Sequence, residues 1–296
     1  MKGIILAGGR GTRLYPSTLS TCKQLLPIYD KPMIYYPLSV LMLAGIREIL
    51  IISTPQDVER FQAIFQDGSA LGLSFSYAAQ PFPRGIAEAF LIGKSFIENQ
   101  NVALILGDNI FYGHHLSQVL QDSVKLQKGG RIFGYEVKDP ERYGVIVFNE
   151  KGKMIDIIEK PKEAPSRYAV TGLYFYDQSV VDLAKELRPS ARGELEITDL
   201  NRAYLERGEL DLHLFDRGFA WLDTGTCDAL QNAAAYVQAI QARQGIKIGC
   251  IEEIAYKMGY IDEEQFLERA QFFSQSEYGA YLLEIAQKFS RDFTFL

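Results

Sequence analysis

A glycine-rich loop follows the first apolar segment of the chain. Residues 3–7 form a short apolar run, and residues 8–14 continue it with the sequence GGRGTRL. Glycines adopt positive φ angles at low cost and let a ligand approach the backbone closely. The exposed N–H groups of such a loop bind anions, and the Arg13 guanidinium adds a planar donor for phosphate oxygens. The loop therefore indicates phosphate binding, although an ordinary turn after a strand has a similar composition.

Two common phosphate-binding patterns do not fit this loop. A Walker A loop requires Gly-Lys-Ser/Thr after four intervening residues, and no lysine stands at that place. A dinucleotide-binding fingerprint that began at Gly9 would end on a third glycine, where this chain has Leu14. The sequence therefore predicts a phosphate loop of another kind.

Asp108 follows a second apolar segment, residues 102–106. If both segments are strands of one parallel sheet, Asp108 and the glycine loop lie at the same edge of it. Mg²⁺ in proteins prefers one or two carboxylates together with substrate phosphate oxygens and water. Asp108 is therefore a candidate metal ligand, and the alternative is an aspartate that only shapes a turn or caps a helix.

The elements expected in the first third of the chain alternate in type. Strands are expected at 3–7, 46–53 and 73–78, and helices at 32–45 and 58–65. This alternation predicts an α/β fold with a mostly parallel, Rossmann-like sheet flanked by helices. Ligands of such sheets bind beyond the carboxyl ends of the strands, where the glycine loop lies.

Further elements are expected along the rest of the chain. A helix that runs to about Glu98 should follow the loop 80–87, and a second helix should follow Arg192 and run through Leu205. Strands are expected at 102–106, 131–138, 155–159 and 169–176, and helices at 228–245, 251–258, 262–270 and 277–289. We therefore expect an α/β core at 1–226 and, at 227–296, a helical extension of the same domain.

Composition limits the classes of function. The chain has 296 residues, 47% hydrophobic and 23% charged, values typical of a soluble globular protein with a large core. Its net charge of -6 argues against a nucleic acid or an anionic membrane as partner. The three cysteines are widely separated and suit a reducing cytosol. No segment approaches the ~20 apolar residues of a membrane span, and we expect a cytoplasmic protein.

The first 27 residues carry a longer pattern. The sequence LAGGxGTRL, followed by Lys23 and then by Leu-Leu-Pro, resembles the signature of the sugar nucleotidyltransferases. These enzymes join a nucleoside triphosphate to a sugar 1-phosphate. The resemblance runs from residue 1 to about 260, with the motifs in the family's order, and it implies the nucleotide-diphospho-sugar transferase type of fold.

The resemblance implies a nucleotide site around the glycine loop. Its residues would be Leu6, Gly8, Gly9, Gly11, Thr12, Arg13, Lys23, Gln24, Gln80, Gly85 and Asp108. Gln80 and Gly85 would contact the base. The loop departs from the family pattern Pro-Ser-Pro-Asp-Gly at Phe82 and Arg84, Glu88 replaces a usual glutamine, and Arg10 replaces a common serine. These departures leave the selectivity between dTTP and UTP open.

The resemblance also implies a sugar-phosphate site. Its residues would be Tyr143, Gly144, Glu159, Lys160, Val170, Tyr174 and Arg192. Glu159 would bind sugar hydroxyls, and Lys160 would bind the 1-phosphate. The residue types alone also fit a surface ion pair for Glu159 and Lys160, a core position for Tyr174, and a solvated turn for Arg192.

The catalytic residues would be Arg13, Lys23, Asp108, Lys160 and Asp223, and the resemblance implies that Asp108 and Asp223 hold Mg²⁺. A sugar phosphate is already anionic at pH 7, so the reaction requires no protein nucleophile. The repulsion between two polyanions must instead be neutralised, and positioning and charge stabilisation supply catalysis. The expected mechanism is in-line attack on the α-phosphorus without a covalent intermediate.

Residues 31–38 and 169–176 match the short bacterial thymidylyl branch of the family rather than its uridylyl and adenylyl branches. This implies dTTP and glucose 1-phosphate as substrates, with UTP as a weaker donor. The alternatives are another base or sugar, or a non-catalytic nucleotide sensor, which would be expected to lose the carboxylates or lysines.

Relatives are commonly homotetramers, and several have a regulatory nucleotide site at a subunit interface. The matching positions in this chain are Tyr112, Gly113, Arg217 and the segment 250–254. The alternative is that these are ordinary packing and helix-terminal residues.

Overall fold

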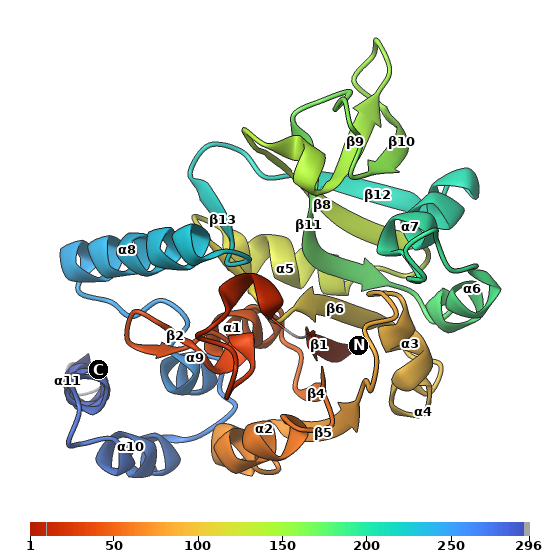
Figure 1. The fold of residues 1–296 in the computed structure, drawn as a ribbon. Helices are drawn as coiled ribbons and strands as arrows, with labels where there is room; N and C mark the ends of the chain where they lie inside the picture. Colours follow the sequence, from red (N-terminus) through yellow and green to blue (C-terminus); the bar gives the residue numbers. More distant parts are fainter. Residues whose placement is uncertain (10, 293–296) are drawn as a thin grey trace.

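The structure, a computed structural model, describes residues 1–9 and 11–292 (Figure 1). Arg10, one of the departures from the family pattern, lies outside the described residues. Strand β1 (Lys2–Ala7) is at the centre of the largest sheet and pairs in parallel with β4 (Glu48–Ser53) and β6 (Val102–Leu106). Strand β5 (Ser74–Ala79) extends this parallel half beyond β4. The carboxyl ends of these strands therefore meet at one edge of the sheet.

Helices cover both faces of the parallel half. Ile5 packs in the same core cluster as α1 (Tyr35–Leu43) and α2 (Val58–Phe65), whereas Ile4 packs with α3 (Glu88–Ile92). Successive side chains of a strand point to opposite faces, so a strand buried on both faces is apolar throughout. This explains why the first strand appears in the sequence as an uninterrupted apolar run.

The other half of the sheet is mixed in direction. Strand β11 (Tyr168–Tyr176) runs antiparallel to β6 and to β8 (Gly130–Glu136), and its register shifts between Val170 and Tyr174. The remaining strands of this half are β9 (Gly144–Phe148), β10 (Met154–Glu159) and β12 (Leu210–Leu214). Helix α7 (Ile197–Glu206) packs on β10 and β12, and helix α6 (Val180–Glu186) packs against α3 and α7.

A separate two-stranded ribbon leaves this edge of the sheet. Strand β7 (Asn109–Gly113) starts two residues after β6 and pairs in antiparallel fashion with β13 (Phe219–Asp223). Asn109 lies directly opposite Asp223 in the register. The ribbon therefore joins two segments that are far apart in the sequence.

The chain ends in four helices, α8 (Cys227–Gln244), α9 (Ile251–Lys257), α10 (Glu263–Phe272) and α11 (Glu277–Asp292), together at one side of Figure 1. The Thr226 hydroxyl caps α8 by accepting from the Ala229 N–H group at 3.2 Å. Asp262 and Gln265 form the expected capping box of α10. A short hairpin of β2 (Pro27–Ile28) and β3 (Lys31–Pro32) contacts the connection between α8 and α9 through an ion pair of 2.6 Å between Asp30 and Lys247.

The predicted α/β fold with a helical C-terminal segment is confirmed, and several boundaries differ. The helix expected at 32–45 begins only at Tyr35, because Lys31–Pro32 pairs in the hairpin. The helix expected to reach Glu98 is divided at Gly93 into α3 and α4 (Lys94–Ile97). Strands β2, β3, β7, β9, β12 and β13 and helices α5 (Leu116–Val124) and α6 were not predicted.

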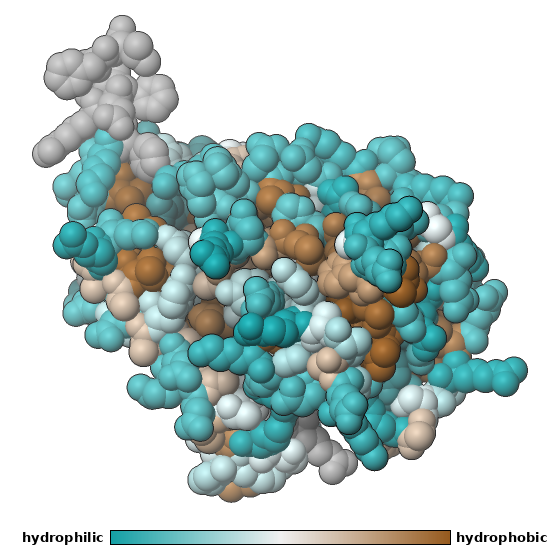
Figure 2. All heavy atoms as spheres, turned by 90° about the horizontal axis from the view of Figure 1, so that it is seen from above, coloured by the Kyte–Doolittle hydropathy of each residue, from teal (hydrophilic) through white to brown (hydrophobic). Residues whose placement is uncertain are grey.

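The face of the molecule drawn in Figure 2 is predominantly polar. Figure 2 shows one face of the molecule, on which hydrophilic residues separate small groups of apolar ones. Among the described residues, no helix is both long and apolar enough to cross a membrane. Cys22 and Cys250 are buried and Cys227 is exposed, and the three are not linked by disulfides.

Candidate active site

A cavity of about 440 Å³ opens at the edge of the sheet where β1 and β6 end. It collects most of the predicted site residues in its lining: Leu6, Gly8, Gly9, Arg13, Gln24, Gln80, Gly85, Asp108, Tyr143, Gly144, Glu159, Lys160, Val170, Tyr174, Arg192 and Asp223. Lys23 is not part of this lining but contacts Asp108, which is. Gly11 and Thr12 lie at the start of a short 3-10 helix (Thr12–Leu14) and are not part of the lining.

The β7–β13 ribbon brings the two predicted metal carboxylates together. Asp108 immediately precedes β7, and Asp223 is the last residue of β13. Thr224 links the two segments, because its N–H group and its hydroxyl donate to the Asp108 carbonyl oxygen at 3.3 and 2.9 Å. Strand pairing thus sets the relative position of two carboxylates that the sequence separates widely.

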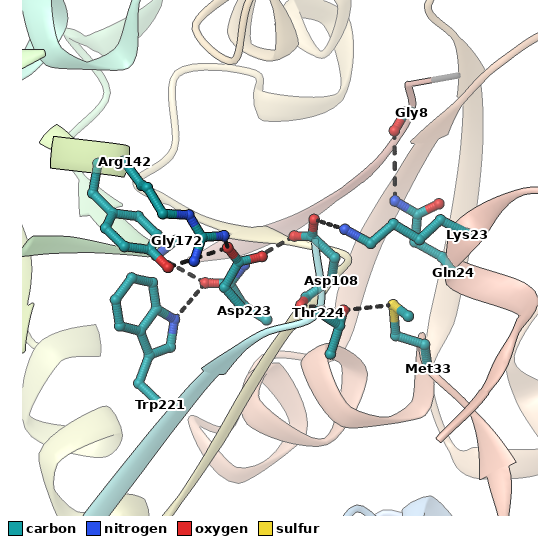
Figure 3. Close-up of polar contacts among 12 residues, drawn as sticks. Gly8, Lys23, Gln24, Met33, Asp108, Arg142, Gly172, Trp221, Asp223 and Thr224 are labelled. Atoms are coloured by element: carbon teal, nitrogen blue, oxygen red, sulfur yellow. Dashed lines mark hydrogen bonds and ion pairs between the residues drawn. The ribbon is translucent and has the colours of Figure 1, made fainter. Parts of the chain in front are cut away.

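Each carboxylate has its own cation (Figure 3). The Lys23 ammonium, which is buried, donates to Asp108 Oδ2. The Arg142 guanidinium donates to Asp223 Oδ2 at 3.2 Å and to Asp139 at 2.7 Å. The hydrogen bond to Asp139 is the main reason that the pKa of Arg142 is raised, so this group stays cationic. The site therefore holds two separately neutralised carboxylates.

Tyr143 also contacts Asp223. Its hydroxyl donates to Asp223 Oδ2 at 3.2 Å. Burial, and then the charge of Asp223, raises the pKa of Tyr143, so its hydroxyl keeps its proton at neutral pH. Arg13 lies close by, since Arg13 Nη1 and both Asp223 carboxylate oxygens are within 3.5 Å of the position that a Cβ would take on Gly225.

The base end of the cavity is formed by Gln80 and its neighbours. Gln80 Nε2 donates to Glu88 Oε2 at 2.8 Å and to the Gly85 carbonyl oxygen at 3.3 Å. Gln80 Oε1 faces the glycine loop, where a Cβ on Gly8 would lie only 3.0 Å from it. The Gln80 amide is therefore oriented with its oxygen toward the loop.

Two of the departures from the family pattern point away from the cavity. Phe82 is 59% exposed, and the Arg84 guanidinium lies 5.5 Å from the centroid of its ring. Neither residue lines the cavity, although Pro83 between them does. Of the departures that are described, only Glu88 acts on the cavity, through Gln80.

The sugar-phosphate end of the cavity begins where β10 ends. Lys160 has a φ angle of 42°, an uncommon conformation for a lysine, and its Nζ lies 3.5 Å from Glu159 Oε1. Glu159 accepts hydrogen bonds from the Thr198 hydroxyl at 2.6 Å and from Arg192 at 3.1 Å. Glu159 is thus held by two donors, whereas the Lys160 side chain is 48% exposed and can bind an anion.

Arg192 is not a freely solvated turn residue. Its guanidinium also contacts Glu196 at 2.8 Å and Glu194 at 3.6 Å. Tyr174 belongs both to the core and to the cavity wall, since it is only 3% exposed and its ring stacks on that of Tyr176. The core interpretation of Tyr174 therefore holds, and its contact with the sugar stays a prediction.

The sequence analysis missed Asn109, Arg142, Thr198 and Trp221. Arg142 lies within the motif that predicted Tyr143 and Gly144, but its sequence position does not reveal that it reaches Asp223. Asn109 follows Asp108 directly, and its buried amide contacts three groups of the site. No periodicity or spacing distinguishes these residues, since their contacts join segments that are distant in the sequence.

The described residues contain no cluster of three or more metal-binding side chains. Two neighbouring carboxylates fit a hard divalent cation that completes its oxygen ligands with phosphates and water. The contact of Lys23 with Asp108 shows that a cation is stable beside this carboxylate. The donor set therefore fits Mg²⁺.

Comparison with known proteins agrees with the geometry. The chain matches the family "Nucleotidyl transferase" over residues 2–239. It is 56% identical over 288 residues to a glucose-1-phosphate thymidylyltransferase of Neisseria meningitidis, covering 97% of this chain and 100% of that protein. A Mycobacterium tuberculosis protein of the same name is 51% identical, with the same coverage.

Solved structures have the same fold. The structure of a Bacillus anthracis protein assigned as a glucose-1-phosphate thymidylyltransferase, in complex with sucrose, has a TM-score of 0.74 and 43% identity, covering 80% of this chain and 94% of that one. A UDP-glucose pyrophosphorylase in complex with UDP-glucose has a TM-score of 0.70 and 29% identity, covering 80% and 98%. The chain belongs to the nucleotidyl transferase family and groups within it with the glucose-1-phosphate thymidylyltransferases.

Proposed function

We propose that this enzyme transfers dTMP from dTTP to α-D-glucose 1-phosphate, giving dTDP-glucose and pyrophosphate. The observation that carries the proposal is the position of Asp108 and Asp223, side by side between the glycine loop and the Glu159–Lys160 end of one cavity. A triphosphate on the loop and a sugar phosphate at Lys160 would face each other across these carboxylates. The identity of the base and of the sugar is taken from the names of the relatives.

The residues of the chain position the substrates and neutralise charge. The glycine loop and Arg13 bind the triphosphate, and Lys160 binds the phosphate of the sugar. A phosphate oxygen of glucose 1-phosphate forms a bond to the α-phosphorus of dTTP. The bond from that phosphorus to the αβ-bridging oxygen breaks, and its electron pair leaves with pyrophosphate. No protein group forms a covalent bond, and no proton is transferred.

Asp108 and Asp223 would hold Mg²⁺, which supplies Lewis-acid stabilisation of phosphate charge when bound. Lys23 and Arg142 then have a second role besides balancing a carboxylate, which is to bind substrate phosphates. Each now balances a carboxylate, and each becomes available to substrate phosphates once that carboxylate has another cation. Tyr143 keeps its proton and continues to fix the orientation of Asp223.

The other functions are less well supported. A non-catalytic sensor is not expected to keep Asp108, Asp223, Lys23 and Lys160, all of which this chain has. UTP is expected as a second, weaker donor, because a site that merely tolerates an added hydroxyl discriminates by only about 100-fold.

A matrix of nucleoside triphosphates against sugar 1-phosphates, read by pyrophosphate release with and without Mg²⁺, tests the proposal. We expect dTTP with glucose 1-phosphate to give the highest kcat/KM and activity to require the metal. A strong preference for ATP, CTP or GTP would refute the assignment of the base, and preference for another sugar would refute that of the acceptor.

We further propose a homotetramer with a second nucleotide site around Tyr112, Gly113, Arg217 and residues 250–254. Tyr112 donates to Gln244 Oε1 at 2.6 Å, and Cys250 and Glu252 are buried, so Ile254 would be the part of that segment most accessible to a ligand. Light scattering tests the assembly. Monomeric behaviour, or inhibition by dTDP-sugars that is purely competitive with dTTP, would count against it.

A further inference from the structure

Asn109 is a buried polar side chain at the start of β7. It is 3% exposed and makes three hydrogen bonds. Its Oδ1 accepts from the backbone N–H group of Gly172 at 3.1 Å and from Trp221 Nε1 at 2.6 Å. Its Nδ2 donates to Asp108 Oδ1 at 2.9 Å. The side chain thus connects three separate strands with the first carboxylate of the site.

These partners leave only one orientation for the amide. A backbone N–H group and an indole N–H group are both donors and never acceptors. The oxygen of Asn109 must therefore face them, and its amino group must face Asp108. The amino group fixes the plane of the Asp108 carboxylate and leaves Oδ2 for the Lys23 ammonium.

The contacts continue from Asn109 to the second carboxylate. The Trp221 ring packs against that of Tyr143 with a centroid distance of 5.1 Å. The Tyr143 hydroxyl donates to Asp223 Oδ2 at 3.2 Å. Asn109 is also the residue directly opposite Asp223 in the ribbon. A continuous series of contacts therefore links Asp108 to Asp223 through Asn109, Trp221 and Tyr143.

We propose that Asn109 is a positioning residue that orients Asp108 and couples it to Asp223 through Trp221. The inference rests on the proposed function, because it assigns these carboxylates to the bound metal and triphosphate. Groups that orient metal ligands in this way typically contribute 10–100-fold to metal affinity or activity.

Asn109→Asp separates positioning from support of the fold. The new carboxylate still accepts from Gly172 and Trp221, but its second oxygen faces Asp108 Oδ1, an acceptor, and repels it. Asn109→Ser, a neutral and shorter variant, loses the contacts without adding charge. We expect kcat to fall about 10–100-fold in both variants, with KM for each substrate within about threefold of wild type.

Asn201→Ser is the matched control. Asn201 is also a buried asparagine whose Oδ1 accepts from an aromatic side chain, the Tyr176 hydroxyl at 2.5 Å, but it lies on α7 outside the cavity lining. The control should lower the urea midpoint of unfolding, because it removes the hydrogen bond from Tyr176, while kcat stays within twofold of wild type. Equal losses of kcat in the two serine variants would indicate a general packing effect and overturn the proposal.

Trp221 is the only tryptophan of the chain, so its fluorescence reports directly on the series of contacts between Asp108 and Asp223. Adding Mg²⁺ and dTTP without sugar phosphate should change its emission in the wild type. In Asn109→Ser, equilibrium dialysis should still detect bound dTTP, but the change in emission should be lost. A full change in the variant, or none in the wild type despite bound dTTP, would overturn the coupling.

The kinetic results distinguish failure of the proposed function from failure of the positioning role of Asn109. If the wild type makes no pyrophosphate from dTTP and glucose 1-phosphate, the proposed function fails. If the wild type is active and both Asn109 variants keep its kcat, the positioning role alone fails. A loss of kcat in Asn109→Asp but not in Asn109→Ser would indicate an effect of added charge and would also overturn it.

Discussion

At the scale of single residues, the site is a set of charges balanced in pairs. Lys23 balances Asp108, Arg142 balances Asp223, and Arg192 balances Glu159. Lys160 is less closely paired than these cations. Its side chain is half exposed, and its Nζ lies 3.5 Å from the nearest carboxylate oxygen. A loosely held cation at the sugar-phosphate end is suited to binding a phosphate that arrives from solvent.

Asp108→Asn and Asp223→Asn keep the size of each side chain and remove its charge. If these carboxylates hold Mg²⁺, each variant should lose at least about 100-fold in kcat, because metal stabilisation of phosphate charge contributes several kcal/mol. Binding of dTTP, measured by equilibrium dialysis, should weaken less than turnover. Normal turnover by either variant would contradict the metal assignment.

Lys160→Ala should act on the other substrate. Removing one charge-assisted contact of about 1.5–3 kcal/mol should raise KM for glucose 1-phosphate about 10–100-fold and leave KM for dTTP nearly unchanged. Additional Mg²⁺ should not restore activity. Lys162→Ala removes an exposed lysine outside the cavity lining and serves as the control. A raised KM for dTTP instead would contradict the role of Lys160.

Glu88 should influence the choice of base through Gln80. Its carboxylate only accepts hydrogen bonds, so it holds the Gln80 amino group and leaves the Gln80 oxygen for a base with an imino N–H, such as thymine. Glu88→Met removes this acceptor, and the preference for dTTP over dCTP should fall about tenfold, equivalent to about 1.4 kcal/mol. Glu88→Gln keeps an acceptor and should stay close to wild type. An unchanged preference in Glu88→Met would show that Gln80 needs no such support.

At the scale of elements, the sequence predicted the central strands of the sheet and missed β7, β9, β12 and β13. β1, β4 and β6 are continuous apolar runs, which identify them without knowledge of their partners. β7 and β12 are short and of mixed character, and they exist because of partners distant in the sequence. Asp108 was predictable as the residue after a buried strand, whereas the roles of Asn109 and Arg142 depend on the β7–β13 pairing.

Gly172 is the position on β11 where an added methyl group would meet the Asn109 side chain. A Cβ there would lie 2.5 Å from Asn109 Oδ1 and 2.8 Å from Leu106 Cδ1. Gly172→Ala should therefore lower the free energy of unfolding by about 1–3 kcal/mol and reduce kcat by displacing Asn109. Urea unfolding and steady-state kinetics measure the two effects.

Thr171→Val is the control for Gly172→Ala. The neighbouring Thr171 has a buried hydroxyl with no hydrogen-bond partner among the described residues. Its replacement by valine removes an unsatisfied group and should be neutral or stabilising. Equal destabilisation by both substitutions would show that this part of β11 tolerates no change and that the Gly172 contact is not specific.

At the scale of the whole molecule, the C-terminal helices pack on α1 and its preceding hairpin. The Tyr260 hydroxyl donates to the Met42 carbonyl oxygen at 2.7 Å, and Lys247 forms its ion pair with Asp30. Within the helices, the fully buried Glu252 accepts from Arg269 at 3.3 Å and from Tyr278 at 2.5 Å. These contacts join α9, α10 and α11 into one unit against the core.

Glu252→Ala should destabilise the whole molecule rather than the site. Loss of one partner of a buried pair costs about 3–5 kcal/mol, and the lower value is expected because the Arg269 side chain is 24% exposed. Urea unfolding should show this loss, while KM for both substrates stays unchanged in the folded protein. Glu264→Ala, at an exposed position of α10, should change neither quantity. A large change in KM would instead connect the helices to catalysis.

The β7–β13 ribbon also determines when the enzyme can first work during its synthesis. The ribosome completes β7 long before it makes β13, and translation at roughly 5–20 residues per second separates the two strands by several seconds. During that interval the edge of β7, with the apolar residues Ile110 and Phe111, has no partner from β13, and such edges invite pairing with other chains. A nascent chain that stops before Asp223 lacks the second carboxylate. If Asp223 holds the metal as proposed, catalysis begins only after the segment that pairs with β7 has been translated.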